Sequence, residues 1–273
     1  DACHSYEQWA QDLELLVELG VSHYRFSLAW PRIQPSGTGA VEKRGLAYYD
    51  RLVDGLLERD ITPMITLYHW DLPQPLEDAG GWPVRDTAYH FADYTAIVRD
   101  ALGDRVKLWA TLNEPWCAAY LGYCMGVHAP GRQEPQAAHR AAHHLMLGHG
   151  LAAQVLHESG SDGVGLVLNL APIWPDRLEA ARAARDVDAL RNRIWVNPLV
   201  DGAYDSELLE LAPVLGDSEL VRDGDLATIQ GSADWLGINY YTPLRVDVGE
   251  PESAGVGDDP AAYPGIDGLV FKA

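Results

Sequence analysis

The sequence has 273 residues, of which 47% are hydrophobic, a length and composition that suit one large domain with a sizeable core. Its formal net charge of −20 at pH 7 disfavours nucleic acid and anionic membrane surfaces as partners. No run of about 20 apolar residues and no signal peptide is visible, so the sequence predicts no membrane span.

Five short apolar runs alternate along the chain with longer segments of helical periodicity. The runs are apolar on both faces, as expected for parallel strands that are covered on both sides. This alternation predicts right-handed βα units and a parallel sheet. The predicted strands are Tyr24–Leu28, Met64–Leu67, Leu108–Leu112, Val164–Leu168 and Trp235–Ile238, and the predicted helices are 6–19, 46–59, 86–102 and 136–157. Residues 243–267 are rich in Gly, Pro and Asp and are expected to form a long loop.

Two architectures are built from such units, the (β/α)8 barrel and the open doubly wound sheet. A nucleotide-binding sheet would need a Gly-rich phosphate turn, and the sequence contains no GxGxxG or GxxxxGK[ST]. Polar groups instead follow one strand after another, as they do at the C-terminal face of a barrel. The predicted fold class is therefore α/β, a (β/α)8 TIM barrel, with about five of the eight strands present in this chain.

The sharpest motif is Thr-Leu-Asn-Glu-Pro at 111–115. Glu114 follows a predicted strand and has the amide of Asn113 beside it, which suits glycoside hydrolysis: a carboxylic acid protonates the glycosidic oxygen, and the amide binds a sugar hydroxyl. Such an acid works near neutral pH in an apolar setting or beside a second carboxylate. Apolar walls could come from Trp109, Leu112 and Trp116. Taken alone, the motif also fits a helix N-terminus, with Asn as the cap and Glu-Pro in the first turn.

Three other strand ends carry candidate groups. His69 can hydrogen-bond hydroxyls and Trp70 offers a face for stacking, although both residues could simply belong to the core. Arg25 lies inside an apolar strand, and a buried arginine needs an anion, either a nucleophilic carboxylate or a structural ion-pair partner. Tyr241 could donate its hydroxyl to a carboxylate or only pack at its strand end.

Neither the histidines nor the cysteines indicate a metal site. His139 and His143 are four residues apart, but no HExxH motif or carboxylate partner accompanies them, so we expect no bound metal. Cys3, Cys117 and Cys124 are odd in number and form no CxxC pair. We therefore expect buried free thiols in a reducing, cytoplasmic compartment.

Together these motifs resemble those of glycoside hydrolase family 1. Each motif alone is moderately specific, but their common order along essentially the whole chain leaves little room for chance. The Asn-Glu-Pro-Trp-Cys version looks closest to bacterial β-glucosidases. The matching segments are Tyr24–Pro31, Tyr68–Gln74, Thr111–Trp116, Gly126–Gly131 and Asp234–Thr242.

The resemblance implies a retaining β-glycosidase that hydrolyses terminal β-linked glucose, or a related sugar, from β-glucosides or oligosaccharides without a metal or organic cofactor. It implies that Glu114 is the catalytic acid/base and that the nucleophile is held between two orienting residues, Arg25 and Tyr241. The predicted substrate-binding residues are His69, Trp70, Asn113 and Asn239.

Two signatures of the family are not found: a first strand with a sugar-binding Gln, and a Thr-Glu-Asn-Gly strand with the nucleophile. We therefore expect residues 1–273 to be a single catalytic-domain fragment, truncated at both ends and inactive alone. A 6-phospho-β-glycosidase and a non-catalytic sugar-binding homologue stay open, and the unseen strand would separate the latter from an enzyme. The preferred sugar, the aglycone and assembly into a homo-oligomer are also open.

Overall fold

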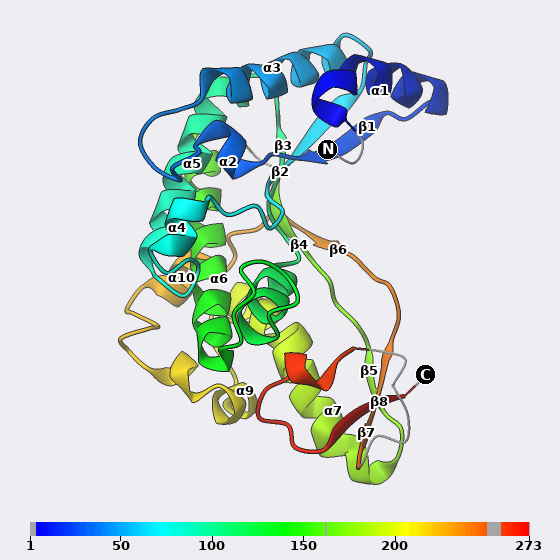
Figure 1. Cartoon of the computed structure of the whole chain (residues 1–273), viewed down its shortest axis with the longest axis vertical. Coiled ribbons are helices and arrows are strands. Elements are labelled where there is room, and N and C mark those ends of the chain that lie inside the picture. The colour runs from blue at the N-terminus through cyan, green and yellow to red at the C-terminus, as the bar shows by residue number, and fades with distance from the viewer. Residues whose placement is uncertain (1–3, 162, 250–257, 273) are drawn as a thin grey trace.

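The computed structural model describes residues 4–161, 163–249 and 258–272. Its centre is a five-stranded sheet in which all neighbouring strands are parallel (Figure 1). The strands are β1 (His23–Ser27), β2 (Thr62–Tyr68), β3 (Leu108–Asn113), β4 (Gly163–Leu168) and β6 (Trp235–Ile238). All five predicted strands are confirmed, and their bounds differ from the predicted ones by at most two residues.

The order of the strands separates the two candidate architectures. The sheet runs β1-β2-β3-β4-β6, so each strand lies beside the next strand of the sheet along the chain. A doubly wound sheet reverses its order at a switch point, whereas a barrel adds each strand beside the last. The sheet therefore corresponds to five consecutive βα units of a TIM barrel, and the predicted fold class is confirmed.

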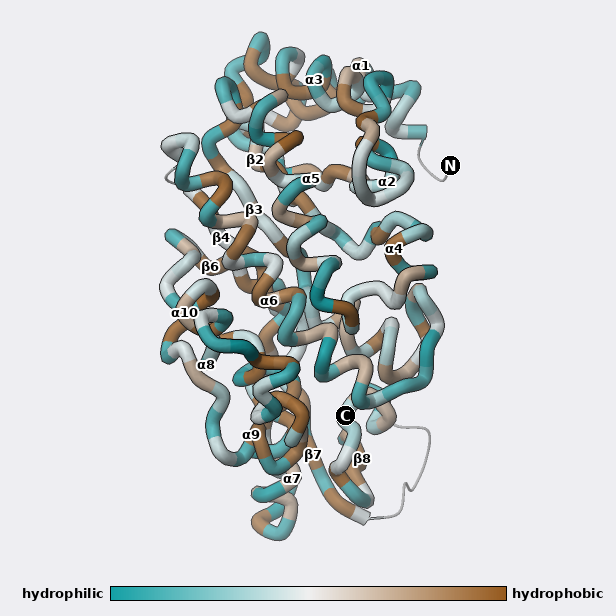
Figure 2. Tube along the Cα trace, turned by 90° about the vertical axis from the view of Figure 1, so that its left-hand side faces the viewer, coloured by the Kyte–Doolittle hydropathy of each residue, from teal (hydrophilic) through white to brown (hydrophobic). Residues whose placement is uncertain are grey.

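Four long helices match the predicted periodic segments; α1 precedes β1, and the other three connect successive strands. Figure 2 shows α1 and α3 alternating between hydrophilic and hydrophobic stretches, as helices with one buried face do. Gly20 ends α1 in a left-handed conformation, with a φ of 69°, and its N–H bonds the last turn. The four helices are α1 (Ser5–Leu19), α3 (Lys43–Leu57), α5 (Asp86–Leu102) and α6 (Pro135–Glu158).

Shorter helical segments fill the remaining connections. None of the described helices is long and apolar enough to cross a membrane. The α-helices are α2 (Trp30–Ile33), α4 (Gln74–Asp78), α7 (Ala181–Asp188), α8 (Ile194–Val200), α9 (Ser206–Leu211) and α10 (Asp225–Ile229). The π-helices are η1 (Cys117–Cys124) and η3 (Ala189–Arg193), and the 3₁₀ turns are η2 (Leu178–Ala180), η4 (Pro213–Gly216) and η5 (Pro260–Ala262).

A second, three-stranded sheet corrects the prediction of a long loop over 243–267. It has the order β5-β7-β8 and lies at the end of the molecule away from α1 and α3 (Figure 1). In the first three residues of β7 the side chains alternate, with Leu244 and Val246 buried and Arg245 exposed. The flanking Gly, Pro and Asp residues hid this period-2 pattern. The strands are β5 (Ile173–Pro175), β7 (Leu244–Val248) and β8 (Leu269–Lys272); residues 250–257 lie outside the described part of the chain.

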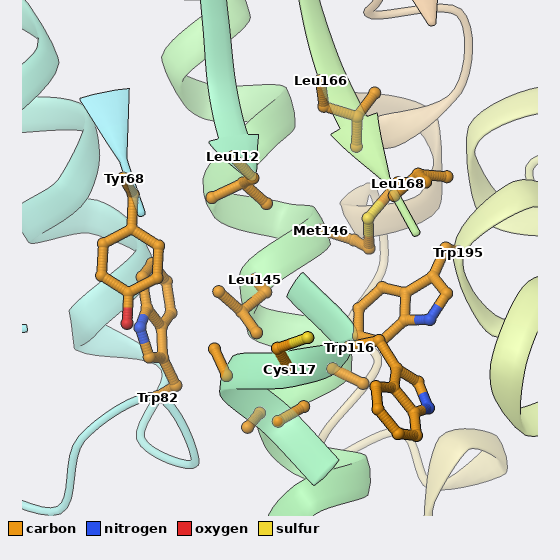
Figure 3. Packing of buried hydrophobic residues seen from close by; sticks show 14 of the residues in the cluster. Tyr68, Trp82, Leu112, Trp116, Cys117, Leu145, Met146, Leu166, Leu168 and Trp195 are labelled. Carbon is orange, nitrogen blue, oxygen red and sulfur yellow. The ribbon is translucent and has the colours of Figure 1, made fainter. Parts of the chain in front are cut away.

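The core explains why the strand ends are held firmly. Four tryptophans are completely or almost completely buried around the sheet: Trp30, Trp82, Trp109 and Trp195. Figure 3 shows apolar side chains gathered at the ends of the strands, next to the segment that carries Cys117 and Trp116. Those labelled from the strands are Tyr68, Leu112, Leu166 and Leu168.

The expectation that every strand is apolar and covered on both faces is wrong for the two edge strands. In β6 the side chains of Leu236 and Ile238 are 39% and 58% exposed, and in β1 His23 and Arg25 are exposed. The inner strands β2, β3 and β4 are almost entirely buried. The difference follows from position, because within the described residues β1 and β6 each pair on one side only.

Candidate active site

The predicted candidates gather at the carboxyl ends of β2, β3 and β6. Parallel strands in sequential order end at the same edge of a sheet, so residues far apart in sequence meet there. His69 follows β2, Asn113 ends β3 with Glu114 after it, and Asn239 follows β6. Hydrogen bonds connect all four side chains.

The backbone at Glu114 has an unusual conformation. Its φ of 47° lies in the left-handed region, which costs a residue with a Cβ about 1–3 kcal/mol. The pairing of β3 with β4 shifts register between Ala110 and Asn113, and the Glu114 N–H then donates to the carbonyl of Val167 at 2.7 Å. Helical structure begins directly afterwards, where the Cys117 N–H donates to the Glu114 carbonyl at 2.9 Å. Such backbone outliers cluster at functional sites.

The Glu114 carboxyl is held by neutral donors. Only 5% of the residue is exposed. Asn239 Nδ2 donates to Oε1 at 2.6 Å, and the Tyr241 hydroxyl donates to the same oxygen at 3.3 Å. The Cys117 thiol donates to Oε2 at 3.3 Å. The charge of Glu114, followed by burial, raises the pKa of Tyr241, so this hydroxyl stays protonated as a donor.

The amide of Asn113 fixes the tautomer of His69. Arg25 can only donate, so its Nη2 contact requires Asn113 Oδ1 on that side and leaves Nδ2 facing His69 Nε2 at 3.1 Å. His69 Nε2 is therefore an acceptor, and Nδ1 carries the hydrogen that it donates to Ser27 Oγ at 3.0 Å. Burial and then the charge of Arg25 lower the pKa of His69, although Glu114 and Asp71 oppose this, and the ring is accordingly neutral.

Arg25 departs from its predicted surroundings. The residue is exposed rather than buried, because β1 is an edge strand. Its Nε donates to Thr66 Oγ1 at 2.9 Å and its Nη2 to Asn113, and among the described residues no carboxylate forms an ion pair with it. Although the residue as a whole is exposed, its guanidinium is partly covered by neighbouring groups, which lowers the pKa of Arg25, and the charge of Glu114 partly offsets this. The anion that the sequence led us to expect beside Arg25 is therefore not found in the described part of the chain.

Trp70 contacts the site through the backbone of Asn113 and through two histidine rings. Its backbone φ is 80°, again in the left-handed region. Its indole N–H donates to the main-chain carbonyl of Asn113 at 2.9 Å, and its ring lies 5.3 Å from that of His128 and 5.0 Å from that of His69. The indole thus holds the backbone of Asn113.

Cavities and metal-binding geometry add little to this cluster. A cavity of about 360 Å³ beside β1 has Arg25 and Ser27 in its wall. A larger one of about 590 Å³ lies between the start of α1 and Arg32, away from the strand ends. No three potential metal ligands gather within the described residues. His139 pairs with Tyr120, and His143 with Tyr204 and Asp225.

Sequence reasoning missed the residues that hold the candidates in place. Ser27 ends β1 and bonds His69, and Thr66 lies two residues before the end of β2 and bonds Arg25. Cys117 lies three residues after Glu114, which is helical spacing, and this was a usable signal. Cys117 and Cys124 are free and buried; Cys3 lies outside the described residues.

Comparison with known proteins gives a consistent result. The sequence model of glycosyl hydrolase family 1 matches residues 1–261. The thermostable β-glucosidase B of Thermobispora bispora is 47% identical over 272 residues, which are 99% of this chain and 55% of that protein. The β-glucosidase of Agrobacterium sp. is 45% identical over 90% of this chain and 54% of its own length. The chain thus spans about half the length of the curated relatives it matches.

Solved structures agree with the sequence comparison. The psychrophilic β-glucosidase of Micrococcus antarcticus has a TM-score of 0.93 at 44% identity and is matched over 98% of this chain and 59% of that one. The β-glucosidase of Thermotoga maritima in complex with deoxynojirimycin has a TM-score of 0.86 at 39% identity, over 99% of this chain and 58% of that one. The five-stranded sheet is therefore a part of the fold of these β-glucosidases.

Proposed function

The chain belongs to glycosyl hydrolase family 1, and from that premise we propose that it supplies the acid/base half of a retaining β-glucosidase active site. One observation supports this most: a buried carboxyl, Glu114, is held by neutral donors at the meeting point of three strand ends. Neutral donors orient a carboxyl without engaging it in an ion pair, and so leave it able to carry and release a proton.

In the proposed reaction Glu114 protonates the glycosidic oxygen, and the aglycone leaves as an alcohol. A second carboxylate attacks the anomeric carbon and forms a covalent glycosyl-enzyme. Glu114, now ionised, removes a proton from water, which attacks the same carbon and releases the sugar with retained configuration. No step requires a metal or an organic cofactor.

We propose that the second carboxylate comes from residues outside this chain. Retaining enzymes need two carboxyl groups about 5–5.5 Å apart. Within the described residues the groups bonded to the cluster are amide, imidazole, guanidinium, phenol, hydroxyl, thiol and indole groups, and Glu114 is its one carboxyl. Arg25 Nη1 and the Tyr241 hydroxyl would flank and orient the incoming carboxylate.

The proposed substrate is a β-glucoside, because the relatives named above are β-glucosidases. The hydroxyls of the sugar at the cleaved bond would be bound by His69, Asn113 and Asn239. The ring of Trp70 would offer a face for stacking. Ordered donors and acceptors at these positions are already paired with one another, so the site is preorganised before the sugar enters.

The test uses Glu114→Gly in the complete protein. Because the variant lacks a proton donor, kcat/KM should fall by about 10² or more for an alkyl β-glucoside, with a much smaller effect on an activated dinitrophenyl glucoside. Azide should restore turnover by attacking the covalent intermediate and yield a β-glucosyl azide. Equal losses on both substrates without rescue would remove Glu114 from the role.

A further inference from the structure

The Glu114 carboxyl has a second side that the proposed reaction does not use. Oε1 faces Asn239 and Tyr241, whereas Oε2 accepts a hydrogen bond from the thiol of Cys117 at 3.3 Å. Asn169, which follows β4, donates from Nδ2 to the sulfur of Cys117 at 3.5 Å. All three members of this chain of contacts are buried, with 4–6% of each residue exposed. A polar chain therefore runs from the end of β4 to the back of the candidate acid.

We propose that Cys117 is a positioning residue for Glu114, and that Asn169 fixes the thiol that holds the carboxyl. This inference rests on the proposed function of Glu114. The backbone gives the contact its geometry: the strained turn at Glu114 leads straight into η1, and the Cys117 N–H closes that turn on the Glu114 carbonyl. The two side chains are thereby three residues apart on the first helical turn.

The protonation state of the thiol follows from its surroundings. Burial and the neighbouring charge of Glu114 raise the pKa of Cys117 well above its ordinary value, so the sulfur keeps its hydrogen at all working pH values. The bond consequently runs from sulfur to carboxyl. The amide of Asn169 can donate to the sulfur at the same time.

A thiol suits this position because it is a weak donor. Every donor to a carboxyl favours its ionised form, and a weak donor does so least. A weak donor limits the rotation of the carboxyl at a small cost to the protonated form. The substitution of Cys117 should therefore affect proton donation rather than binding.

The chain contains a matched control in Cys124. It lies at the other end of the same π-helix, has the same 6% exposure, and its thiol donates to the carbonyl of Ala261 at 3.3 Å. Cys124→Ala removes the same atoms from an equally buried position that has no contact with Glu114. Any effect common to both variants is thus an effect on packing.

The experiment measures kcat/KM of the complete protein for an alkyl and a dinitrophenyl β-glucoside as functions of pH. For Cys117→Ala we expect about a tenfold loss on the alkyl substrate and about a twofold loss or less on the activated one. Cys117→Ser keeps a hydrogen-bond donor at this position, although a stronger one, and should recover part of the alkyl-glucoside activity; Cys124→Ala should behave as wild type.

Three results would overturn the positioning role. They are equal losses on the two substrates, equal losses for Cys117→Ala and Cys117→Ser, and a Cys124→Ala variant that matches Cys117→Ala. A failure of the proposed function looks different, because the unsubstituted protein would then not hydrolyse either glucoside or Glu114→Gly would retain the substrate pattern of wild type.

Discussion

Asn113 is bound on every side. Its Oδ1 accepts from Arg25 and, at 3.4 Å, from Asn239; its Nδ2 donates to His69, and its main-chain carbonyl accepts from Trp70. Residues from β1, from the segment after β2 and from the segment after β6 thereby meet at one residue of β3. Because both its side chain and its backbone are fixed, Asn113 presents the second N–H of its amide in one orientation. Recognition of a single hydroxyl requires such a fixed donor.

We predict that Asn113→Ala lowers kcat/KM by the equivalent of about 2–4 kcal/mol. The amide would bind the hydroxyl beside the reacting carbon, and its loss also releases Arg25 and His69. The loss should appear mainly in kcat, since such bonds strengthen in the transition state.

Asn192→Ala is the matched control, because this asparagine bonds the backbone of Ala171 and the side chain of Asp188 and, within the described residues, no member of the Glu114 cluster. It should lower the unfolding temperature and keep kcat/KM within about threefold of wild type. If a sugar-like inhibitor bound wild type and Asn113→Ala equally well and kcat were unchanged, the assignment of Asn113 would be wrong.

At the scale of single residues, the sequence allowed us to propose which side chains contact the sugar, but not which neighbouring residues hold those side chains in place. The residue types at 69, 113 and 114 suit the proposed recognition of a sugar, and the structure brings these residues together. The tautomer of His69 depends on Arg25, which lies 44 residues earlier on another strand, and no local pattern contains that information. Arg25 was expected to be buried because its neighbours are apolar, yet exposure depends on whether β1 is an inner or an edge strand.

Between elements, a buried charge network ties α5 to α6 and α10. Arg85, just before α5, forms an ion pair with Asp225 at the start of α10, and His143 of α6 bonds the same carboxylate at 3.0 Å. Burial favours the neutral form of Asp225, but the bonds from Arg85, His143 and the Arg222 amide outweigh it and hold the pKa of this carboxyl well below its usual range. The ionised carboxylate is therefore part of the folded state.

We predict a pH dependence of stability from this carboxylate. Because its pKa is lower in the folded than in the unfolded chain, it stabilises the fold fully above about pH 4–5, and this contribution is lost as the pH falls. Asp225→Asn should cost about 3–5 kcal/mol at neutral pH, since Arg85 and His143 lose their anion, and should flatten the acid side of the stability curve. Urea unfolding between pH 3 and pH 7 measures both effects.

Asp100→Asn is the control for that measurement. Asp100 forms an ion pair with Arg99 at 2.7 Å, but its side chain is 69% exposed, so its loss should cost less than about 1 kcal/mol. If the free energy of unfolding changed with pH in the same way for Asp225→Asn and for wild type, Asp225 would not be the titrating group.

How well a helix or strand could be predicted depends on whether its sequence pattern lies within one segment. The five parallel strands and four long helices have patterns complete within one segment, and their positions were predicted within two residues or a few more at helix starts. The strands β5, β7 and β8 have three to five residues each and exist through pairing with one another. Ion pairs such as Arg177 with Asp247 stabilise that sheet, and such partners lie about 70 residues apart.

For the whole molecule, the β6 edge of the sheet carries exposed apolar side chains. Leu236 and Ile238 of β6 are partly exposed, and Tyr240 and Tyr241 after it are 57% and 76% exposed. Exposed strand edges with apolar side chains are sites of pairing with further strands or of aggregation. The relatives are about twice as long as this chain, so further strands are available in proteins of this family.

We predict that residues 1–273, expressed alone, have no β-glucosidase activity. Retaining hydrolysis needs two carboxyl groups, and Glu114 is the one candidate at the described strand ends. Asp71 also follows a strand but lies exposed in the Trp-Asp-Leu-Pro turn, and Asp234 lies at the opposite end of its strand, where it bonds His157 and the Val164 N–H. The chain alone would also leave Arg25 without an anion and β1 and β6 without their outer neighbours.

The measurement compares the purified segment with the complete protein on an aryl β-glucoside, with size-exclusion chromatography to record association through the open edges. The complete protein should turn over the substrate, and the segment should remain at least about 10³-fold slower because the covalent step has no nucleophile. Separately expressed remaining residues, added to the segment, should restore part of the activity by closing the barrel. Turnover by the segment alone at a rate close to that of the complete protein would mean that a nucleophile lies within these 273 residues.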